Sequence, residues 1–274
     1  MSFPSAASST SPLPLVTSDD VIARLEGLVA SLGREPKDTL LAFDADGTLW
    51  SGDVGIDNFE ALLAKGAILP AALTTLRDEA ASAGLPLADD PTAQARILYE
   101  AYARGAYPEE NAFRVMACAF SGYREEAVRR FAADVAGAAG LRARLHLELT
   151  PIVTWAARQG IPRYVVSASH AIVVKSCIEL LGLPIDGTFA MSQAEQNGVL
   201  VARLHDPVTY GAGKTEALRA GVAGKMLLGA FGDSAFDLHL LREARLAVAV
   251  RPKPELRARA SECDGLVELA PAAR

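Results

Sequence analysis

Apolar residues follow two different spacings along the chain. Between residues 18 and 32 they recur at intervals of three and four, which is typical of a helix with one buried face. Short apolar runs without this period occupy residues 39–44, 164–167, 226–231 and 246–250. Runs of this length, bounded by polar or glycine residues, are typical of parallel strands that are buried on both faces. We therefore expect a strand at each of these runs.

Helical patterns lie between or after these runs, at residues 149–159, 170–181, 213–222, 235–243 and 253–262. Strands and helices in alternation predict an α/β fold, with a Rossmann-like parallel sheet covered by helices on both faces. Within residues 189–201, the sequence Gln196-Asn-Gly198 predicts the turn of a β-hairpin.

The segment from residue 53 to residue 147 differs from the rest because it has no convincing strand pattern. It is rich in Ala, Leu, Glu and Arg, and helical stretches are predicted at residues 57–64, 70–82, 91–103, 108–120 and 123–137. We therefore predict three parts, which are a flexible leader at 1–17, an α/β core made of 18–52 and 148–274, and an all-helical insertion at 53–147.

The charge balance narrows the range of partners. The chain has 27 Lys and Arg against 33 Asp and Glu, which gives a net charge of −6. An acidic surface repels phosphate backbones, so nucleic acids and anionic membranes are not expected as general partners. No apolar run approaches the roughly 20 residues that cross a bilayer, and the first residues lack the basic start of a signal peptide.

The cysteines and histidines show no metal-binding pattern. Cys118, Cys177 and Cys263 are widely spaced and odd in number, and the four histidines have no paired spacing. Buried free thiols in a reducing cytoplasm are the plain interpretation. A zinc site is not expected.

The strongest local feature is Asp44-Ala-Asp46-Gly-Thr48, which comes directly after the first predicted strand. In an open α/β sheet, ligands bind beyond the carboxyl ends of the strands. Two carboxylates at such a place can hold Mg²⁺, and one of them can act as a nucleophile or as an acid and base. The alternative, a polar turn with a permissive glycine, is equally compatible with this motif alone.

Two further strand ends favour the functional interpretation. Ser167 and Ala168 lie where a predicted strand meets a helix, and such a turn is suited to phosphate oxygens. Asp233 and Asp237 follow another predicted strand. Each feature alone is compatible with an ordinary helix cap, but polar residues at three strand ends of one sheet converge on one crevice.

Lys214 lies in Gly211-Ala-Gly-Lys214-Thr, which is similar to the end of a phosphate-binding P-loop. The full P-loop pattern requires a glycine at the position of Val208, so we exclude that motif. Lys214 is then either a cation at the start of a helix near the crevice or a solvated surface lysine.

Along the chain these residues form the series Asp-x-Asp-Gly-Thr, a serine at a strand end, a lysine, and Gly-Asp-x-x-x-Asp. This series resembles that of the haloacid dehalogenase-like (HAD) hydrolase superfamily over roughly residues 39–255. The second aspartate resembles the phosphatase branch, because the dehalogenase members lack an acid there. The helical insertion is similar to the cap of the phosphoserine phosphatase-like group.

The resemblance implies a Mg²⁺-dependent phosphomonoesterase. Asp44 would attack phosphorus and form an aspartyl-phosphate, and Asp46 would first protonate the leaving oxygen and then activate water. The Asp44 carboxylate, the Asp46 carbonyl and Asp233 would hold Mg²⁺.

The same resemblance assigns the phosphate-binding groups. Ser167, the N–H group of Ala168 and Lys214 would bind the phosphate oxygens. Asp237 would orient Lys214 or a metal-bound water molecule.

The resemblance to phosphoserine phosphatases also concerns the substrate. Asp53 matches an acidic position that faces the substrate ammonium group, and Arg114 matches an arginine that meets the substrate carboxylate. An ion pair on a helix surface is an equally good interpretation of Arg114. Phe236 and the turn before His170 depart from the phosphoserine phosphatase pattern. Trp50 either shapes the pocket or packs in the interior.

We therefore expect an enzyme, a monomer or a homodimer, that hydrolyses a small phosphorylated metabolite, with a phosphoserine-like compound as the leading candidate. One alternative is a mutase that transfers the phosphoryl group from the same aspartate to a sugar. Another is a binding module that keeps the fold without catalysis.

Overall fold

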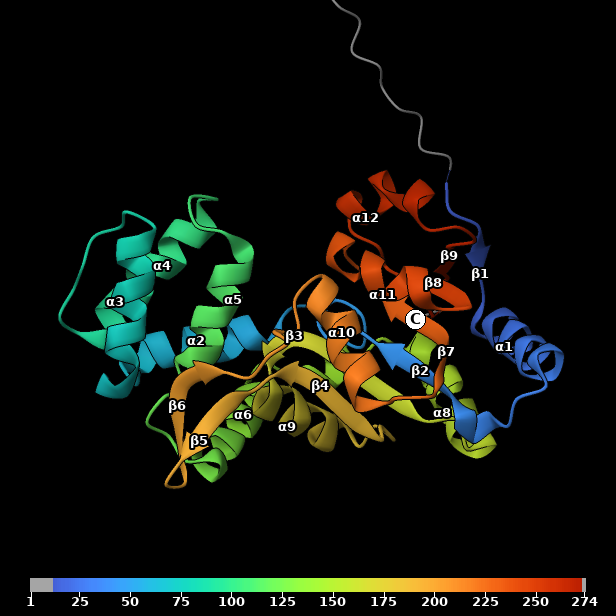
Figure 1. The fold of residues 1–274 in the computed structure, drawn as a ribbon, viewed down its shortest axis with the longest axis horizontal. Helices are drawn as coiled ribbons and strands as arrows, with labels where there is room; N and C mark the ends of the chain where they lie inside the picture. The colour runs from blue at the N-terminus through green and yellow to red at the C-terminus, as the bar shows by residue number, and fades with distance from the viewer. Residues whose placement is uncertain (1–11, 273–274) are drawn as a thin grey trace, which may run out of the picture.

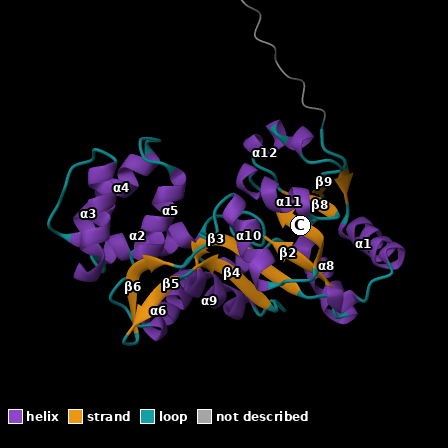
Figure 2. Ribbon diagram, viewed as in Figure 1, coloured by secondary structure: helices purple, strands orange, loops and turns teal. Residues whose placement is uncertain are grey.

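A computed structural model describes residues 12–272. It contains a seven-stranded sheet in which every pairing is parallel, which confirms the predicted α/β class (Figures 1 and 2). In spatial order the strands are β1 (Leu15–Val16), β9 (Val267–Leu269), β8 (Leu246–Val250), β7 (Met226–Gly232), β2 (Thr39–Phe43), β3 (Arg163–His170) and β4 (Gly187–Met191).

Successive residues of the central strands point to opposite faces of the sheet, and the residues on both faces are apolar. Helices therefore cover both faces. Leu41 and Phe43 of β2 belong to one buried cluster, and Leu40 and Ala42 to another. The first face carries α1 (Ser18–Leu32), α8 (Thr150–Gln159) and α9 (Ala171–Leu181), and the second carries α10 (Ala212–Gly221), α11 (Leu238–Glu243) and α12 (Pro254–Ala258). Short 3₁₀ turns occur at η1 (Pro36–Asp38), η3 (Leu147–Leu149), η4 (Ala235–Asp237) and η5 (Ala260–Glu262).

Between β2 and β3 the chain, which the structure describes throughout, forms helices and no sheet strand. The elements are α2 (Val54–Lys65), η2 (Pro70–Ala72), α3 (Leu73–Ser82), α4 (Pro91–Ala103), α5 (Glu109–Cys118), α6 (Glu125–Ala138) and α7 (Leu141–Arg144). Helices α3, α4 and α5 stand beside the sheet layer in Figure 1, whereas α6 packs along α9. The segments through which the chain enters and leaves the helical insertion lie side by side. Ser51 N donates to Arg144 O at 2.9 Å, and His146 N donates to Leu49 O at 2.9 Å.

The predicted hairpin exists, but it begins later than expected. Strands β5 (Gln193–Gln196) and β6 (Val199–Leu204) form a separate antiparallel pair, with Asn197 and Gly198 at positive φ in the turn. The preceding residues instead form the parallel edge strand β4. Leu200 exchanges backbone hydrogen bonds with the segment before α6, since Leu200 N donates to Tyr123 O and Gly122 N donates to Leu200 O, each at 2.8 Å.

The predicted leader of 1–17 differs from the structure at its end. Leu15 and Val16 pair with β9, and the Thr17 side chain caps α1. These three residues therefore belong to the folded core, while residues 1–11 lie outside the described part of the chain. The three cysteines are free and buried, as predicted. Among the described residues, no helix is long and apolar enough to cross a membrane.

Candidate active site

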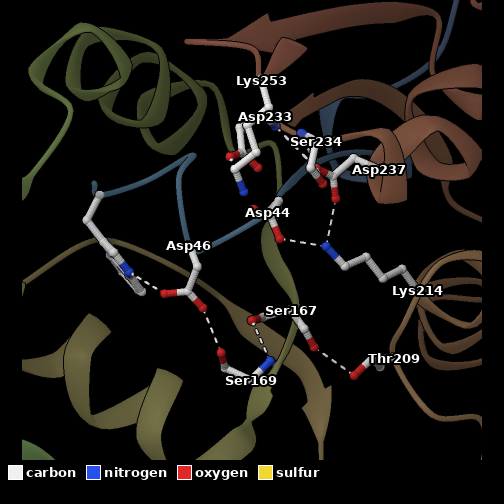
Figure 3. A network of polar contacts seen from close by, with 11 residues as sticks. Asp44, Asp46, Ser167, Ser169, Thr209, Lys214, Asp233, Ser234, Asp237 and Lys253 are labelled. Atoms are coloured by element: carbon white, nitrogen blue, oxygen red, sulfur yellow. Dashed lines mark hydrogen bonds and ion pairs between the residues drawn. The ribbon is translucent and has the colours of Figure 1, made fainter. Parts of the chain in front are cut away.

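The residues singled out in the sequence meet at the carboxyl edge of the three central strands. Asp44 follows β2, Asp233 follows β7, and Ser167 lies in the last part of β3. Because β2 pairs with both neighbours in parallel, these strand ends point in the same direction. The arrangement predicted from three separate motifs is therefore present as one group of side chains (Figure 3).

A cavity opens over this edge. Its lining combines carboxylates, two lysines, small hydroxyl residues and aromatic rings, which are Asp44, Asp46, Asp53, Glu109, Phe113, Ser167, Ala168, Ser169, Tyr210, Lys214, Asp233, Ser234, Phe236 and Lys253. A concave site with converging polar groups is suited to a small molecule.

Lys214 bridges two of the carboxylates. Its Nζ lies 2.6 Å from Asp44 Oδ1 and 2.6 Å from Asp237 Oδ1 (Figure 3). Burial alone would lower the pKa of Lys214, but the charges of Asp237 and Asp44 outweigh it and raise the pKa above its usual value. Lys214 is therefore a buried cation rather than a solvated surface lysine, and Asp44 Oδ2 receives no hydrogen bond from a described residue.

Asp237 is fully buried and holds its neighbours in place. Its Oδ2 accepts hydrogen bonds from Asp233 N, Ser234 N and Ser234 Oγ, at 3.2, 3.0 and 2.9 Å. Its Oδ1 accepts from Lys214. Because both carboxylate oxygens of Asp237 accept hydrogen bonds, Asp237 is better placed to orient Lys214 than to bind a ligand.

Asp46 is held by three donors. Its Oδ1 accepts from Trp50 Nε1 at 2.8 Å and from Val54 N at 2.7 Å, and its Oδ2 accepts from Ser169 Oγ at 2.7 Å. Burial raises the pKa of Asp46, although these hydrogen bonds oppose the shift. A raised pKa suits a carboxyl group that must carry a proton near neutral pH. Trp50 is fully buried, so it acts through packing and through this hydrogen bond.

An irregularity in β3 interrupts its pairing with β4 next to Ser167. The register with β4 passes from Ser167 opposite Ala190 directly to His170 opposite Met191. Ala168 and Ser169 therefore have no partner on β4, and both line the cavity. Ser167 Oγ accepts from Ser169 N at 3.1 Å, and Thr209 Oγ1 fixes Ser167 by donating to its carbonyl oxygen at 2.7 Å.

Asp233 is packed against Gly47 and paired with Lys253. A Cβ atom added to Gly47, which has φ +83°, would fall 2.0 Å from Asp233 Oδ2. Lys253 Nζ lies 2.9 Å from the same oxygen. Burial, followed by the charge of Asp237, raises the pKa of Asp233 to about 6. The close approach of the backbone at residue 47 explains why the motif has glycine there.

The donors at this edge fit a hard divalent cation. Carboxylate oxygens of Asp44, Asp233 and Asp237 lie within 4.8 Å of one another. Since both oxygens of Asp237 are hydrogen-bonded, the available donors are Asp44, Asp233 and the Asp46 carbonyl, which accepts no hydrogen bond from a described residue. Oxygen donors of this kind are those that Mg²⁺ prefers.

The two residues expected to contact the substrate have different positions. Asp53 lines the cavity, but its side chain also caps α2 by accepting from Ile56 N at 2.8 Å. Arg114 does not line the cavity, because α5 directs Glu109 and Phe113 toward it. These two are four residues apart and share a helix face, whereas Arg114 lies about 100° further round the helix. The structure therefore does not support the predicted contact of Arg114.

Six cavity residues were not assigned to the site from the sequence, namely Glu109, Phe113, Ser169, Tyr210, Ser234 and Lys253. Lys253 follows the apolar run that forms β8, so its place after a strand end was a usable signal. Ser169 lies two residues after Ser167, but its bond to Asp46 depends on how β3 packs against the loop that follows β2. The two aromatic residues carry no motif.

Comparison with known proteins agrees with the fold. The family model for haloacid dehalogenase-like hydrolases matches residues 41–242. This match covers more than half of the chain, so the protein belongs to the haloacid dehalogenase-like hydrolase family. A comparison with curated protein sequences gives no significant match.

Several solved structures share the fold. A protein of unknown function from Bordetella pertussis Tohama I is 20% identical with a TM-score of 0.64, covering 85% of this chain and 98% of that one. A substrate-bound phosphoserine phosphatase is 20% identical with a TM-score of 0.50, covering 84% and 92%. Cytosolic 5′-nucleotidase IIIB bound to cytidine is 14% identical with a TM-score of 0.52, covering 90% and 84%. At these identities the likeness concerns the fold alone.

Proposed function

We propose that this protein is a Mg²⁺-dependent phosphomonoesterase that hydrolyses a small phosphorylated metabolite through an aspartyl-phosphate. The observation that carries the proposal is the position of Asp44. Its Oδ1 is held by the buried Lys214, Asp233 lies beside it, and Asp44 lines the cavity. A carboxylate oriented in this way is suited to nucleophilic attack on a bound phosphate.

Asp44 would attack phosphorus with Oδ2 and expel the alcohol. The hydrogen bond from Lys214 to Oδ1 fixes the direction of attack and lowers the cost of placing a carboxylate in a buried site. Hydrolysis of the resulting acyl phosphate would then return Asp44 to its starting state.

Asp46 would supply and remove the protons. Its raised pKa favours a proton on the carboxyl group at the start, which can pass to the leaving oxygen. The carboxylate that remains can then take a proton from the water that attacks the acyl phosphate. Trp50, Val54 and Ser169 donate to that carboxylate and stabilise it between the two steps.

The phosphate oxygens would be bound by Lys214, the Ser167 hydroxyl and the N–H of Ala168, which has no register partner on β4. Mg²⁺, held by Asp44, Asp233 and the Asp46 carbonyl, would supply positive charge that offsets the phosphate and lets it approach a carboxylate. The lining supports this need, because its carboxylates outnumber Lys214 and Lys253.

The helices at 53–147 would act as a cap over the site. Support comes from α5, which lines the cavity with Glu109 and Phe113. It also comes from the adjacent segments through which the chain enters and leaves the insertion. A cap that closes over a small substrate excludes water while the intermediate forms. The resemblance to phosphoserine phosphatases and a shared fold with one of them support a small substrate. A cytoplasmic location stays a prediction.

The proposal is tested by measuring phosphate release from a panel of phosphorylated metabolites with the purified protein. We expect release with Mg²⁺, loss of release with EDTA, and loss in Asp44→Asn with the fold retained. Transfer of phosphate to a sugar phosphate without release of inorganic phosphate would favour a mutase instead. Absence of both release and transfer across the panel would contradict the proposal.

A further inference from the structure

Three aromatic rings from separate parts of the chain line one side of the cavity. Phe113 lies on α5, Tyr210 lies two residues before α10, and Phe236 lies in η4. The ring centroids of Phe113 and Tyr210 are 6.2 Å apart, and those of Tyr210 and Phe236 are 4.8 Å apart. We call these three residues the aromatic wall. It joins the helical insertion to the loop before α10, the helix that carries Lys214, and to η4, which contains Asp237.

Phe236 is unusually exposed for its type. Of the described residues, four large apolar side chains are exposed, namely Leu15, Leu87, Leu147 and Phe236, and Phe236, at 38%, has the only aromatic ring. It lies one residue before the buried Asp237 and faces a cavity. An apolar ring in contact with water is unfavourable, and a ligand that covers it gains the free energy of burial.

The charges around the aromatic wall restrict what can cover it. Asp53 and Glu109 line the cavity as acids, and burial is the main cause that raises the pKa of each. Lys214 is engaged by Asp44 and Asp237, and Lys253 by Asp233. Both lysines of the lining are therefore already ion-paired, and no free cation remains for a second anionic group of the substrate. The carboxyl groups, by contrast, can accept hydrogen bonds from N–H donors.

We propose that the aromatic wall selects phosphomonoesters whose alcohol carries a planar, uncharged ring, and that the ring stacks on Tyr210 and Phe236. Nucleoside monophosphates and phosphorylated aromatic alcohols share this chemistry. The acids Asp53 and Glu109 favour nucleobases, which have N–H donors. The inference rests on the proposed phosphomonoesterase function and replaces phosphoserine as the leading substrate.

The effect can be measured as a ratio of specificity constants. Stacking of a base on an aromatic side chain corresponds to roughly five- to 150-fold in binding. Ribose 5-phosphate has the sugar and phosphate of a nucleotide without the base. We therefore expect kcat/KM for AMP or CMP to exceed that for ribose 5-phosphate by at least about fivefold. Benzyl phosphate supplies a ring without N–H donors, and O-phospho-L-serine supplies a charged substrate without a ring.

The relative kcat/KM values of these substrates distinguish the possible roles of the aromatic wall. Nucleotides above both ribose 5-phosphate and benzyl phosphate support nucleobase selection. Benzyl phosphate equal to the best nucleotide assigns the aromatic wall to aromatic alcohols instead. If ribose 5-phosphate or O-phospho-L-serine matches or exceeds every ring-bearing substrate, the inference is overturned while the phosphomonoesterase function stands.

Variants of Phe236 test whether the ring itself is responsible. Phe236→Leu keeps apolar bulk without the ring, and we expect the ratio of kcat/KM for AMP over ribose 5-phosphate to fall toward one. The matched control is Leu87→Asn, which changes another exposed apolar side chain outside the cavity lining and should keep the wild-type ratio. An unchanged ratio in Phe236→Leu would overturn the inference.

A binding measurement separates this inference from the catalytic proposal. Calorimetry with adenosine, which has the ring but no phosphate, needs no turnover. We expect binding to the wild-type protein that weakens by at least about fivefold in Phe236→Leu. If no substrate is hydrolysed but adenosine binds in this way, the catalytic proposal fails and the aromatic wall is still a ring-binding site. Absence of adenosine binding overturns the inference whatever the activity.

Discussion

The fully buried Trp50 indole donates from Nε1 to Asp46 Oδ1 at 2.8 Å, and Asp46, which is half-buried, lines the cavity. A hydrogen bond to a carboxylate stabilises its charged form and lowers its pKa. Trp50→Phe removes the donor and keeps most of the packing. We expect the pKa of Asp46 to rise further. Because kcat/KM in the first half-reaction requires protonated Asp46, the alkaline limb of the pH profile should move upward by about one unit.

The chain offers a matched control for this change. Trp155 Nε1 donates to Glu26 Oε1 at 2.9 Å on the outer side of the molecule. Trp155→Phe removes an equivalent hydrogen bond at a distance from the cavity and should leave the pH profile unchanged. If Trp50→Phe moves neither limb of the profile, the hydrogen bond does not act on the group that transfers the proton.

Gly47 tests how closely the backbone must approach Asp233. Gly47→Ala would place a Cβ 2.0 Å from Asp233 Oδ2 at φ +83°, whereas Gly66→Ala at φ +59° would meet nothing within 4 Å. Both variants carry the cost of positive φ, about 1 kcal/mol. We expect only Gly47→Ala to weaken Mg²⁺ binding. The Mg²⁺ concentration that gives half-maximal phosphate release should rise by tenfold or more in this variant. Equal behaviour of the two variants would show that conformation alone matters.

Asp233 links the stability of the metal-free protein to pH. A carboxyl with a folded-state pKa near 6 holds its proton in the folded state after the unfolded chain has lost it. Its ionisation therefore destabilises the fold as pH rises from about 4 through 6. In EDTA at pH 7.5, Asp233→Asn should raise the free energy of unfolding by about 2–3 kcal/mol.

This difference should shrink to about 0.5 kcal/mol near pH 4, where Asp233 is neutral in the folded state and about half ionised in the unfolded chain. Urea unfolding at the two pH values measures it. Added Mg²⁺ should stabilise the wild type at pH 7.5 and leave Asp233→Asn nearly unchanged. A variant that is less stable than the wild type in EDTA at pH 7.5 would contradict this assignment.

Lys214 compensates buried charge as well as binding phosphate. Lys214→Met leaves Asp44 and Asp237 facing each other without a cation, so we expect a loss of about 3 kcal/mol in the free energy of unfolding. Lys175 is an exposed lysine on α9, and Lys175→Met should change stability by less than about 0.5 kcal/mol. Denaturant titration of both variants in EDTA gives the comparison, and similar losses would contradict the role of Lys214.

The central strands and most helices could be predicted because their apolar patterns are complete. The run that forms β2 is buried at every position, and the helical period of α4 gives the same bounds as the structure. The edge strands were missed for the opposite reason. Strands β1 and β9 have two and three residues, and most of β4 is only half buried. Such segments carry too little hydrophobic contrast to define a strand.

The candidate site also contains residues that local sequence patterns identify and residues that they do not. Asp44, Asp233 and Lys214 are fixed by local motifs at strand or helix ends, so the sequence was sufficient to group them. Arg114 does not line the cavity, and its contact with a substrate stays a prediction, because the orientation of α5 about its own axis depends on packing that no motif records. The aromatic wall combines three loops or helices that only the tertiary structure brings together.

The most direct test of the account is the mass of the enzyme during turnover. Wild-type protein with Mg²⁺ and its best substrate, quenched in acid within the turnover time, should carry one added phosphoryl group. Peptide mapping should place that group on Asp44, and Asp44→Asn should show neither the group nor phosphate release. A phosphoryl group on another residue, or full turnover by Asp44→Asn, would contradict the proposed mechanism.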